Sequence, residues 1–104
     1  MDLILDNFEG FIWDKGNEQK SFIKHGITPL EAEEAFYNPN FISPDTVHSQ
    51  QETRFRLLGR TNNNKILIVA FTIRSNKARV ISARLANKKE RTMYAQALKA
   101  NPQI

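Results

Sequence analysis

Four arginines in the second half of the sequence have the side chains best suited to chemistry: Arg60, Arg74, Arg79 and Arg84. A guanidinium is planar, stays charged and binds phosphate oxygens in pairs, so it can hold a phosphate whose charge grows during a reaction. A reaction at a phosphate without a metal needs such cations, a base for the attacking hydroxyl and an acid for the leaving oxygen. The arginines therefore suit phosphate binding, and the alternative interpretation is a solvated basic surface.

Two histidines are candidates for proton transfer. His25 is the leading one, because an unperturbed pKa of about 6.5 allows exchange near neutrality; alternatively, it is only a cation favoured by a helix C-terminus before Gly26. His48 lies in a polar loop, as a second catalytic candidate or, the favoured interpretation, as a residue that fixes the loop. Glu52 is either a base or the ion-pair partner of a nearby arginine. Without cysteine or metal-ligand spacing, the sequence predicts neither a metal site nor a cofactor.

Three extended segments must position these arginines. Alternation of apolar and polar residues predicts strands over Arg54–Thr61, Lys65–Arg74 and Lys77–Leu85. The Asn62-Asn63-Asn64 and Ser75-Asn76 connections are short, as in antiparallel hairpins. The segments therefore predict an antiparallel meander in which some arginines converge across neighbouring strands.

The period of two assigns side chains to the faces of this meander. Phe55, Leu57 and Gly59 fall on one face, and Arg54, Arg56 and Arg60 fall on the other. On the third segment Arg79 and Arg84 point to opposite faces if the strand is regular, so they cannot both line one pocket. Arg84 has the alternative of pairing with Glu90 on the following helix.

The first third of the chain predicts a strand over Phe8–Trp13 and then a helix over Lys15–Lys24. Asp14 is the expected N-cap of this helix, and Phe22 and Ile23 are its expected buried residues. Gly26 is expected to end the helix in the left-handed conformation.

Two capping boxes predict the starts of the other helices. Thr28 and Glu31, with Pro29 at the first helical position, open a helix over Pro29–Tyr37, and Phe41–Ser43 is a short optional strand after it. Asn87 and Glu90 open the last helix, whose expected buried residues are Met93, Tyr94, Ala97 and Leu98. The order β-α-α-(β)-β-β-β-α indicates a small α+β fold, with residues 1–104 as a single domain.

Charge is divided unevenly along the chain. Residues 1–53 hold ten acids and three bases, whereas residues 54–104 hold one acid and twelve bases. This asymmetry predicts one positive surface suited to phosphate or to an acidic protein. The sequence contains neither an apolar run of about 20 residues nor a signal peptide, so we expect a cytoplasmic protein that does not enter membranes.

Several motifs occur in a specific order and spacing. They are Trp13-Asp14 with Gly16-Asn17, Lys24-His25-Gly26, the helix capped by Thr28, His48-Ser49-Gln50 with Glu52 and Arg54-Phe55, Leu58-Gly59-Arg60-Thr61, Phe71-Thr72-Ile73-Arg74 and Arg79-Val80-Ile81-Ser82-Ala83-Arg84. In these motifs the chain resembles the BrnT family of bacterial ribonuclease toxins from type II toxin–antitoxin systems. One departure is Ser21, where the family pattern has asparagine.

The resemblance implies a RelE-like fold, with helices packed on a small antiparallel sheet. It also implies a metal-independent endoribonuclease that inhibits translation by cleaving RNA and is neutralised by a BrnA-type antitoxin, in a hetero-oligomer that binds operator DNA through the antitoxin. The expected catalytic residues are His25, Arg60, Arg74 and Arg79, and the expected RNA-binding residues are Lys24, Arg54, Arg84 and Arg91.

Two alternatives to a nuclease stay open. One is a non-catalytic module that docks RNA or a protein on the same basic face, and the other is a toxin with a protein target. A nuclease needs a group of tunable pKa beside the arginines. A basic face without His25 and His48 would therefore favour the binding module.

Overall fold

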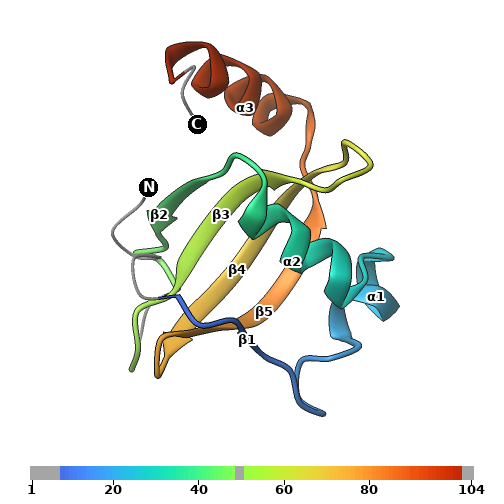
Figure 1. Ribbon diagram of the computed structural model, residues 1–104, viewed down its shortest axis with the longest axis vertical. Helices are drawn as coiled ribbons and strands as arrows, with labels where there is room; N and C mark the ends of the chain where they lie inside the picture. Colours follow the sequence, from blue (N-terminus) through green and yellow to red (C-terminus); the bar gives the residue numbers. More distant parts are fainter. Residues whose placement is uncertain (1–7, 49–50, 102–104) are drawn as a thin grey trace.

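The computed structural model describes residues 8–48 and 51–101, which form one mixed sheet and three helices (Figure 1). The elements are β1 (Phe11–Ile12), α1 (Lys20–His25), α2 (Pro29–Tyr37), β2 (Phe41–Pro44), β3 (Phe55–Arg60), β4 (Ile66–Arg74), β5 (Lys77–Leu85) and α3 (Lys88–Ala100). The strands lie in the order β1-β5-β4-β3-β2. This is the expected α+β arrangement, and the optional strand is present as β2.

The expected meander is confirmed in β3, β4 and β5. Each pair is antiparallel, and Ser75 and Asn76 both have positive φ, at 52° and 64°, in the two-residue turn between β4 and β5. Such a turn matches the right-handed twist of the strands. The prediction of an entirely antiparallel sheet is wrong at one edge, because β1 runs parallel to β5. The expected strand over Phe8–Trp13 is likewise shorter, at Phe11–Ile12.

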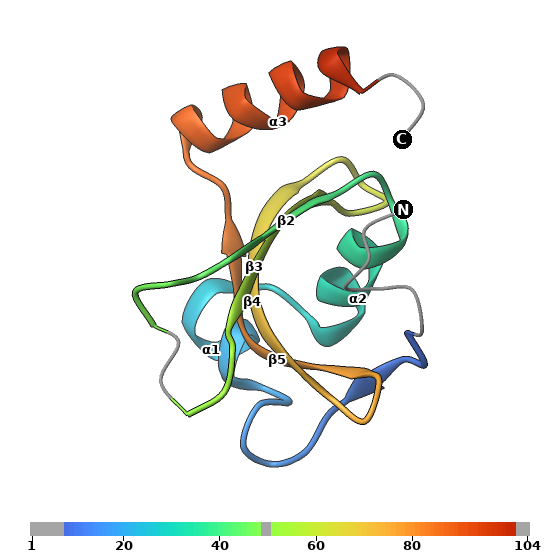
Figure 2. The same ribbon diagram turned by 90° about the vertical axis from the view of Figure 1, so that its left-hand side faces the viewer.

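The core lies between α2 and one face of the sheet. Leu57, Val69 and Phe71 are completely buried there, and the ring of Phe36 on α2 meets that of Phe71 edge-on at 5.0 Å. Gly59 allows the close approach, since a Cβ at this position would lie 2.7 Å from the carbonyl oxygen of Ala35. Figure 2 shows α2 on one side of the sheet and the β2–β3 connection swinging out on the other. The second face is thus left open along much of its length.

The first helix differs from its prediction. It covers Lys20–His25 instead of Lys15–Lys24, and Phe22 and Ile23 are 55% and 77% exposed instead of buried. Asp14 caps a turn in place of the helix, because its Oδ1 accepts a hydrogen bond from Gly16 N at 2.8 Å. The left-handed Gly26 that ends α1 is confirmed, with φ of 72°.

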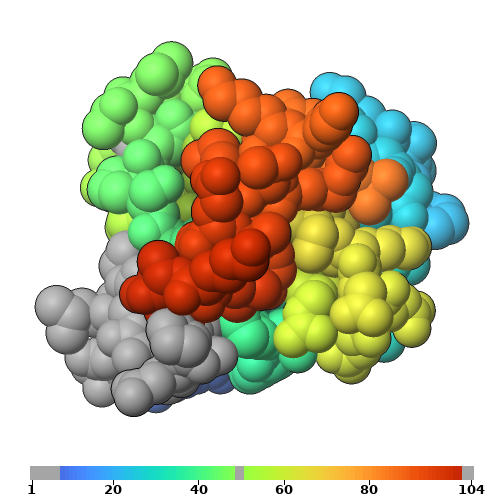
Figure 3. Space-filling view, turned by 90° about the horizontal axis from the view of Figure 1, so that it is seen from above, coloured from blue at the N-terminus to red at the C-terminus, as the bar shows by residue number. Residues whose placement is uncertain are grey.

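The last helix begins as predicted, but fewer of its side chains are buried than expected. Asn87 and Glu90 form the expected capping box, as Thr28 and Glu31 do for α2. Of the expected buried residues of α3, only Tyr94 is buried, and Met93 is 51% exposed. The reason is that α3 lies across one end of the sheet (Figures 1 and 3). Within the described ranges, no helix is long and apolar enough to cross a membrane.

Candidate functional site

A β-bulge in β5 determines which side chains share the open face. The register pairs are Ala70 with Ser82, Phe71 with Val80 and Thr72 with Arg79. Ile81 is therefore an extra residue, which shifts the alternation by one position. Val80 and Ala83 both face the core, and Arg79 and Arg84 both lie on the open face. The expectation that these arginines point to opposite faces assumed a regular strand, and the bulge removes that condition.

The open face carries a pocket of about 360 Å³ near the β4–β5 turn, which we call the arginine pocket. Its lining residues are His48, Gln51, Glu52, Arg54, Thr72, Arg74, Arg79 and Ile81. The arginines come from three adjacent segments of the meander, and the histidine and the glutamate come from the β2–β3 connection. The fold thus brings three of the expected arginines beside a histidine and a carboxylate.

Glu52 is bound to Arg74 within this pocket. Its carboxylate accepts hydrogen bonds from Arg74 Nε, at 3.2 Å, and from Nη2. The hydrogen bond from Arg74 lowers the pKa of Glu52, and the same contact raises the pKa of Arg74. Glu52 is therefore a carboxylate at neutral pH. Both side chains are about half exposed, so water weakens the pair and an incoming anion can compete for the guanidinium.

Arg79 is positioned by the turn that follows β1. Its Nη2 donates to Asp14 Oδ1 at 2.9 Å, and a Cβ on Gly16 would lie 2.9 Å from the same nitrogen. The buried Asn17 fixes this turn, because its Nδ2 donates to the backbone oxygens of Ile12 and Val80, both at 2.9 Å. Sequence reasoning missed the role of Asn17, since one contact depends on a strand far away in the chain. The two hydrogen bonds from Asn17 also explain why the segment before α1 is not helical.

His48 is held by Asp45. Its Nδ1 lies 3.0 Å from Asp45 Oδ2, and its backbone N–H donates to Asp45 Oδ1 at 3.2 Å. Burial alone would raise the pKa of Asp45, but the hydrogen bonds from His48 outweigh that effect and lower it. With the proton on Nδ1 donated to Asp45, Nε2 is left for exchange with a ligand. Asp45 was missed because the sequence marks its segment only as polar loop.

The other histidine and its neighbour lie elsewhere. His25 and Lys24 are exposed in the last turn of α1, which packs along the β5 edge, and neither lines the arginine pocket. Ser21, the departure from the family pattern, helps to fix this helix by accepting a hydrogen bond from Ala83 N at 2.7 Å. Of the two histidines, only His48 stands beside the arginines.

Three further arginines also lie outside the pocket. Arg60 shares its strand face with Arg54, but it is about 20 Å away at the usual rise of a strand. Its Nη1 donates to Asn64 Oδ1 at 3.2 Å. Arg91 donates to the backbone oxygen of Ala86 at 2.9 Å. Arg84 pairs with Glu90, as one alternative from the sequence had it.

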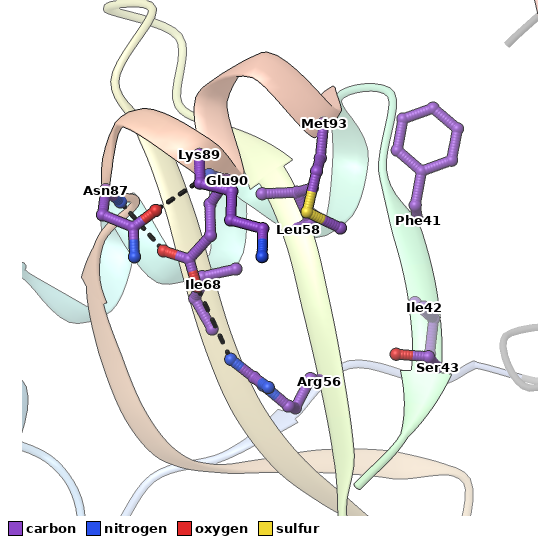
Figure 4. A pocket seen from close by; sticks show the side chains of 10 residues that line it. All are labelled: Phe41, Ile42, Ser43, Arg56, Leu58, Ile68, Asn87, Lys89, Glu90 and Met93. Carbon is purple, nitrogen blue, oxygen red and sulfur yellow. Dashed lines mark hydrogen bonds and ion pairs between the residues drawn. The ribbon is translucent and has the colours of Figure 1, made fainter. Parts of the chain in front are cut away.

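A second hollow, the α3 groove, lies between α3 and the same sheet face (Figure 4). It measures about 370 Å³ and is lined by Phe41, Ile42, Ser43, Arg56, Leu58, Ile68, Asn87, Lys89, Glu90 and Met93. Glu90 accepts from both terminal nitrogens of Arg84, at 2.8 and 2.9 Å, and lies 3.6 Å from Arg56 Nη2. The contact with Arg84 lowers the pKa of Glu90 to about 2. One carboxylate thus bridges two guanidinium groups, and these contacts attach α3 to the sheet.

The two hollows thus differ in chemistry. The arginine pocket combines three arginines with two titratable groups, whereas the α3 groove has an apolar floor and ion pairs centred on Glu90. Among residues 8–48 and 51–101, no group of three or more histidine, cysteine, aspartate or glutamate side chains could hold a metal ion. The arginine pocket is the candidate site for acid–base chemistry at a phosphate.

Comparisons with known proteins identify the family of the chain. The family model described as "Ribonuclease toxin, BrnT, of type II toxin-antitoxin system" matches residues 13–90, a range that contains the whole arginine pocket. The crystal structure of the Brucella abortus ribonuclease toxin BrnT is similar, with 26% identity and a TM-score of 0.54 over 76% of this chain and 97% of that chain. A search of curated proteins finds no match. The chain therefore belongs to the BrnT family of ribonuclease toxins, whose type II toxin–antitoxin systems imply an antitoxin partner.

Proposed function

We propose that this chain is a single toxin domain that cleaves RNA endonucleolytically, without a metal, at the arginine pocket. Cleavage of RNA in the cytoplasm would inhibit translation and growth. The observation that carries the proposal is the placement of His48 and Glu52 beside Arg54, Arg74 and Arg79 in one pocket. It supplies the three parts that metal-free cleavage needs, namely a proton acceptor, a proton donor and cations for the phosphate.

The proposed reaction is an attack of the ribose 2′-oxygen on the adjacent phosphorus. Glu52, a carboxylate at neutral pH, takes the 2′-hydroxyl proton, and Arg74 and Arg79 hold the non-bridging oxygens as negative charge grows on them. His48 acts in its doubly protonated form, with Nδ1–H held by Asp45; it gives the Nε2 proton to the departing 5′-oxygen and is left as the neutral imidazole. The phosphorus–5′-oxygen bond breaks, leaving a 2′,3′-cyclic phosphate and a free 5′-hydroxyl.

This proposal changes the roles expected from the sequence. His48 replaces His25 as the proton-transfer group, and Arg54 joins Arg74 and Arg79 at the phosphate. Arg60, at the far end of the open face, would contact only a distant part of the RNA, as would Lys24 on α1. Arg84 and Arg91 would mainly stabilise the start of α3, because their guanidinium groups bind Glu90 and the Ala86 carbonyl oxygen.

One observation favours the alternative of a non-catalytic binding module. Arg74 and Arg79 each already have a carboxylate partner, Glu52 and Asp14, so the pocket is less positive than the composition suggests. A pocket that only docked RNA would not need a histidine held at Nδ1 by an aspartate, which is the arrangement found at His48. The presence of a tunable group beside the arginines therefore favours the nuclease.

The decisive experiment compares two histidine variants. Purified protein, free of antitoxin and in the presence of a chelator, is incubated with end-labelled RNAs of defined sequence. We expect cleavage by the wild type and by His25→Ala, and a loss of about 100-fold or more in His48→Ala. Product analysis should show 2′,3′-cyclic phosphate ends. Equal loss in both variants, or wild-type binding without cleavage, would contradict the assignment, and the second result would support the binding module.

The antitoxin partner would silence the toxin by covering the same pocket. We propose a hetero-oligomer with a BrnA-type antitoxin, which contacts operator DNA through the antitoxin. Phenylglyoxal, which modifies accessible guanidinium groups, offers a direct test at Arg74, a half-exposed residue. We expect Arg74 to react in the free toxin and to be protected in the complex, as read by peptide mass mapping. Equal modification in both states would place the antitoxin elsewhere.

A further inference from the structure

Thr72 has an unusual hydroxyl group. The residue is only 4% exposed, and its Oγ1 is the one buried side-chain polar atom without a hydrogen-bond partner in the described part of the chain. A buried hydroxyl without a partner destabilises a folded protein, so each such case needs a physical explanation. Valine has nearly the same shape and would fill the site without an unsatisfied hydroxyl.

The location of Thr72 supplies an explanation. Thr72 lies opposite Arg79 in the β4–β5 register and lines the arginine pocket. On its other side Phe55 pairs with Phe71, so that Arg54 continues the register beside Thr72. Thr72 is thus at the floor of the pocket, with Arg79 on the neighbouring strand β5 on one side and Arg54, the residue before β3, on the other.

The neighbouring cations do not satisfy this hydroxyl. A guanidinium only donates hydrogen bonds, so neither neighbouring arginine can accept from the threonine hydroxyl, which is left without an acceptor. The carboxylates of Asp14 and Glu52 bond to Arg79 and Arg74 and leave Thr72 Oγ1 unpaired. An anion with several oxygens, such as the phosphodiester group of a polynucleotide, can accept from the arginines and from the hydroxyl together.

We propose that Thr72 Oγ1 donates a hydrogen bond to a non-bridging oxygen of the phosphate that is bound by Arg54 and Arg79. This inference rests on the proposed function and adds a substrate contact that is neither charged nor titratable. The hydroxyl is kept at the expense of stability and is satisfied only when the phosphate is bound. The bond is expected to strengthen as charge develops on the oxygen during the reaction.

Thr72→Val tests the inference, because it removes the hydroxyl and keeps the shape. We expect an unchanged or higher melting temperature together with a 10- to 100-fold loss of RNA cleavage, the usual effect of one hydrogen bond to a charged group. Thr72→Ser restores the hydroxyl and should recover most of the cleavage, even though the lost methyl group lowers the melting temperature.

Thr61→Val is the matched control. Thr61 is also fully buried on the same meander, but its Oγ1 accepts a hydrogen bond from Lys65 N at 3.0 Å. We expect this variant to melt earlier and to cleave RNA like the wild type. Thr72→Val would thus lose cleavage but not stability, and Thr61→Val would lose stability but not cleavage. Purely structural roles for both threonines cannot produce this pattern.

A binding measurement separates this inference from the proposed function. The probe is a DNA oligonucleotide, which lacks the attacking 2′-hydroxyl, titrated into the wild type, Thr72→Val and Thr61→Val by fluorescence anisotropy. Weaker binding by Thr72→Val alone supports the phosphate contact, even if the wild type fails to cut RNA and the nuclease proposal falls. If Thr72→Val binds the probe and cleaves RNA like the wild type, the inference is overturned while the nuclease proposal stands.

Discussion

Replacement of Glu90 by glutamine tests how α3 is attached to the sheet. Glu90 accepts hydrogen bonds from both terminal nitrogens of Arg84 and from Asn87 N, and it lies near Arg56. Glutamine keeps the shape and an oxygen for the helix cap, but it removes the negative charge. The change therefore isolates the electrostatic part of the contact.

The size of the effect follows from the pKa of Glu90. In the folded protein this pKa falls from its ordinary value of 4.5 to about 2, chiefly through the hydrogen bond from Arg84. The full shift corresponds to roughly 3 kcal/mol. Because the Arg84 and Arg56 side chains are 36% and 45% exposed, solvent screening reduces our expectation to about 1–2 kcal/mol. A depressed pKa stabilises the fold fully above pH 4.5, and this stabilisation is lost as the pH falls towards 2.

Urea unfolding at a series of pH values provides the assay. At pH 7 we expect Glu90→Gln to lower the free energy of unfolding by about 1–2 kcal/mol, and by about pH 3 more than half of the difference from wild type should be gone. Glu18→Gln, which changes an exposed carboxylate, is the control and should match the wild type at every pH. A difference that stays constant from pH 7 to 3 would refute the reasoning and assign the effect to packing.

Three other outcomes are expected. RNA affinity should fall steeply with salt concentration, because bound arginines release counterions from the phosphates; salt-independent binding in a filter assay would contradict this. Arg79→Ala should lower cleavage far more than the melting temperature, whereas Arg60→Ala, at the other end of the face, should cleave like the wild type; early melting with normal cleavage would make Arg79 structural. Gly59→Ala should lower the free energy of unfolding by about 1–3 kcal/mol, because its Cβ would lie 2.7 Å from Ala35 O; an unchanged urea midpoint would show that the close approach can relax.

The elements that the sequence predicts well have local signals. The bounds of α2 and the start of α3 follow from capping boxes, in which side chains bond to backbone groups three residues away. The bounds of β5 follow from its alternation and from the Ser75-Asn76 turn. Each of these signals acts within a few residues, so it can be recognised without knowledge of the fold.

The features that the sequence does not predict depend on contacts between distant segments. Asn17 Nδ2 donates a hydrogen bond to Val80 O, and this contact holds the turn against the sheet edge. The helix α1 therefore begins only at Lys20. The surroundings of the two histidines could not be predicted either: the sequence favoured His25, although both histidines stand near basic residues in the sequence. Only the fold shows that the β2–β3 connection brings His48 to the pocket and that α1 keeps His25 at an edge.

The extra residue at Ile81 reconciles an odd spacing with a shared face of β5. Arg79 and Arg84 are five positions apart, and a regular strand of this length would turn one of them towards the apolar interior. In a chain that lost the codon for Ile81, the two arginines would be four positions apart, so a regular strand would still carry both on the open face. Under selection against the toxin, inactive alleles should therefore include substitutions of the charged residues of this strand but not the loss of this one codon.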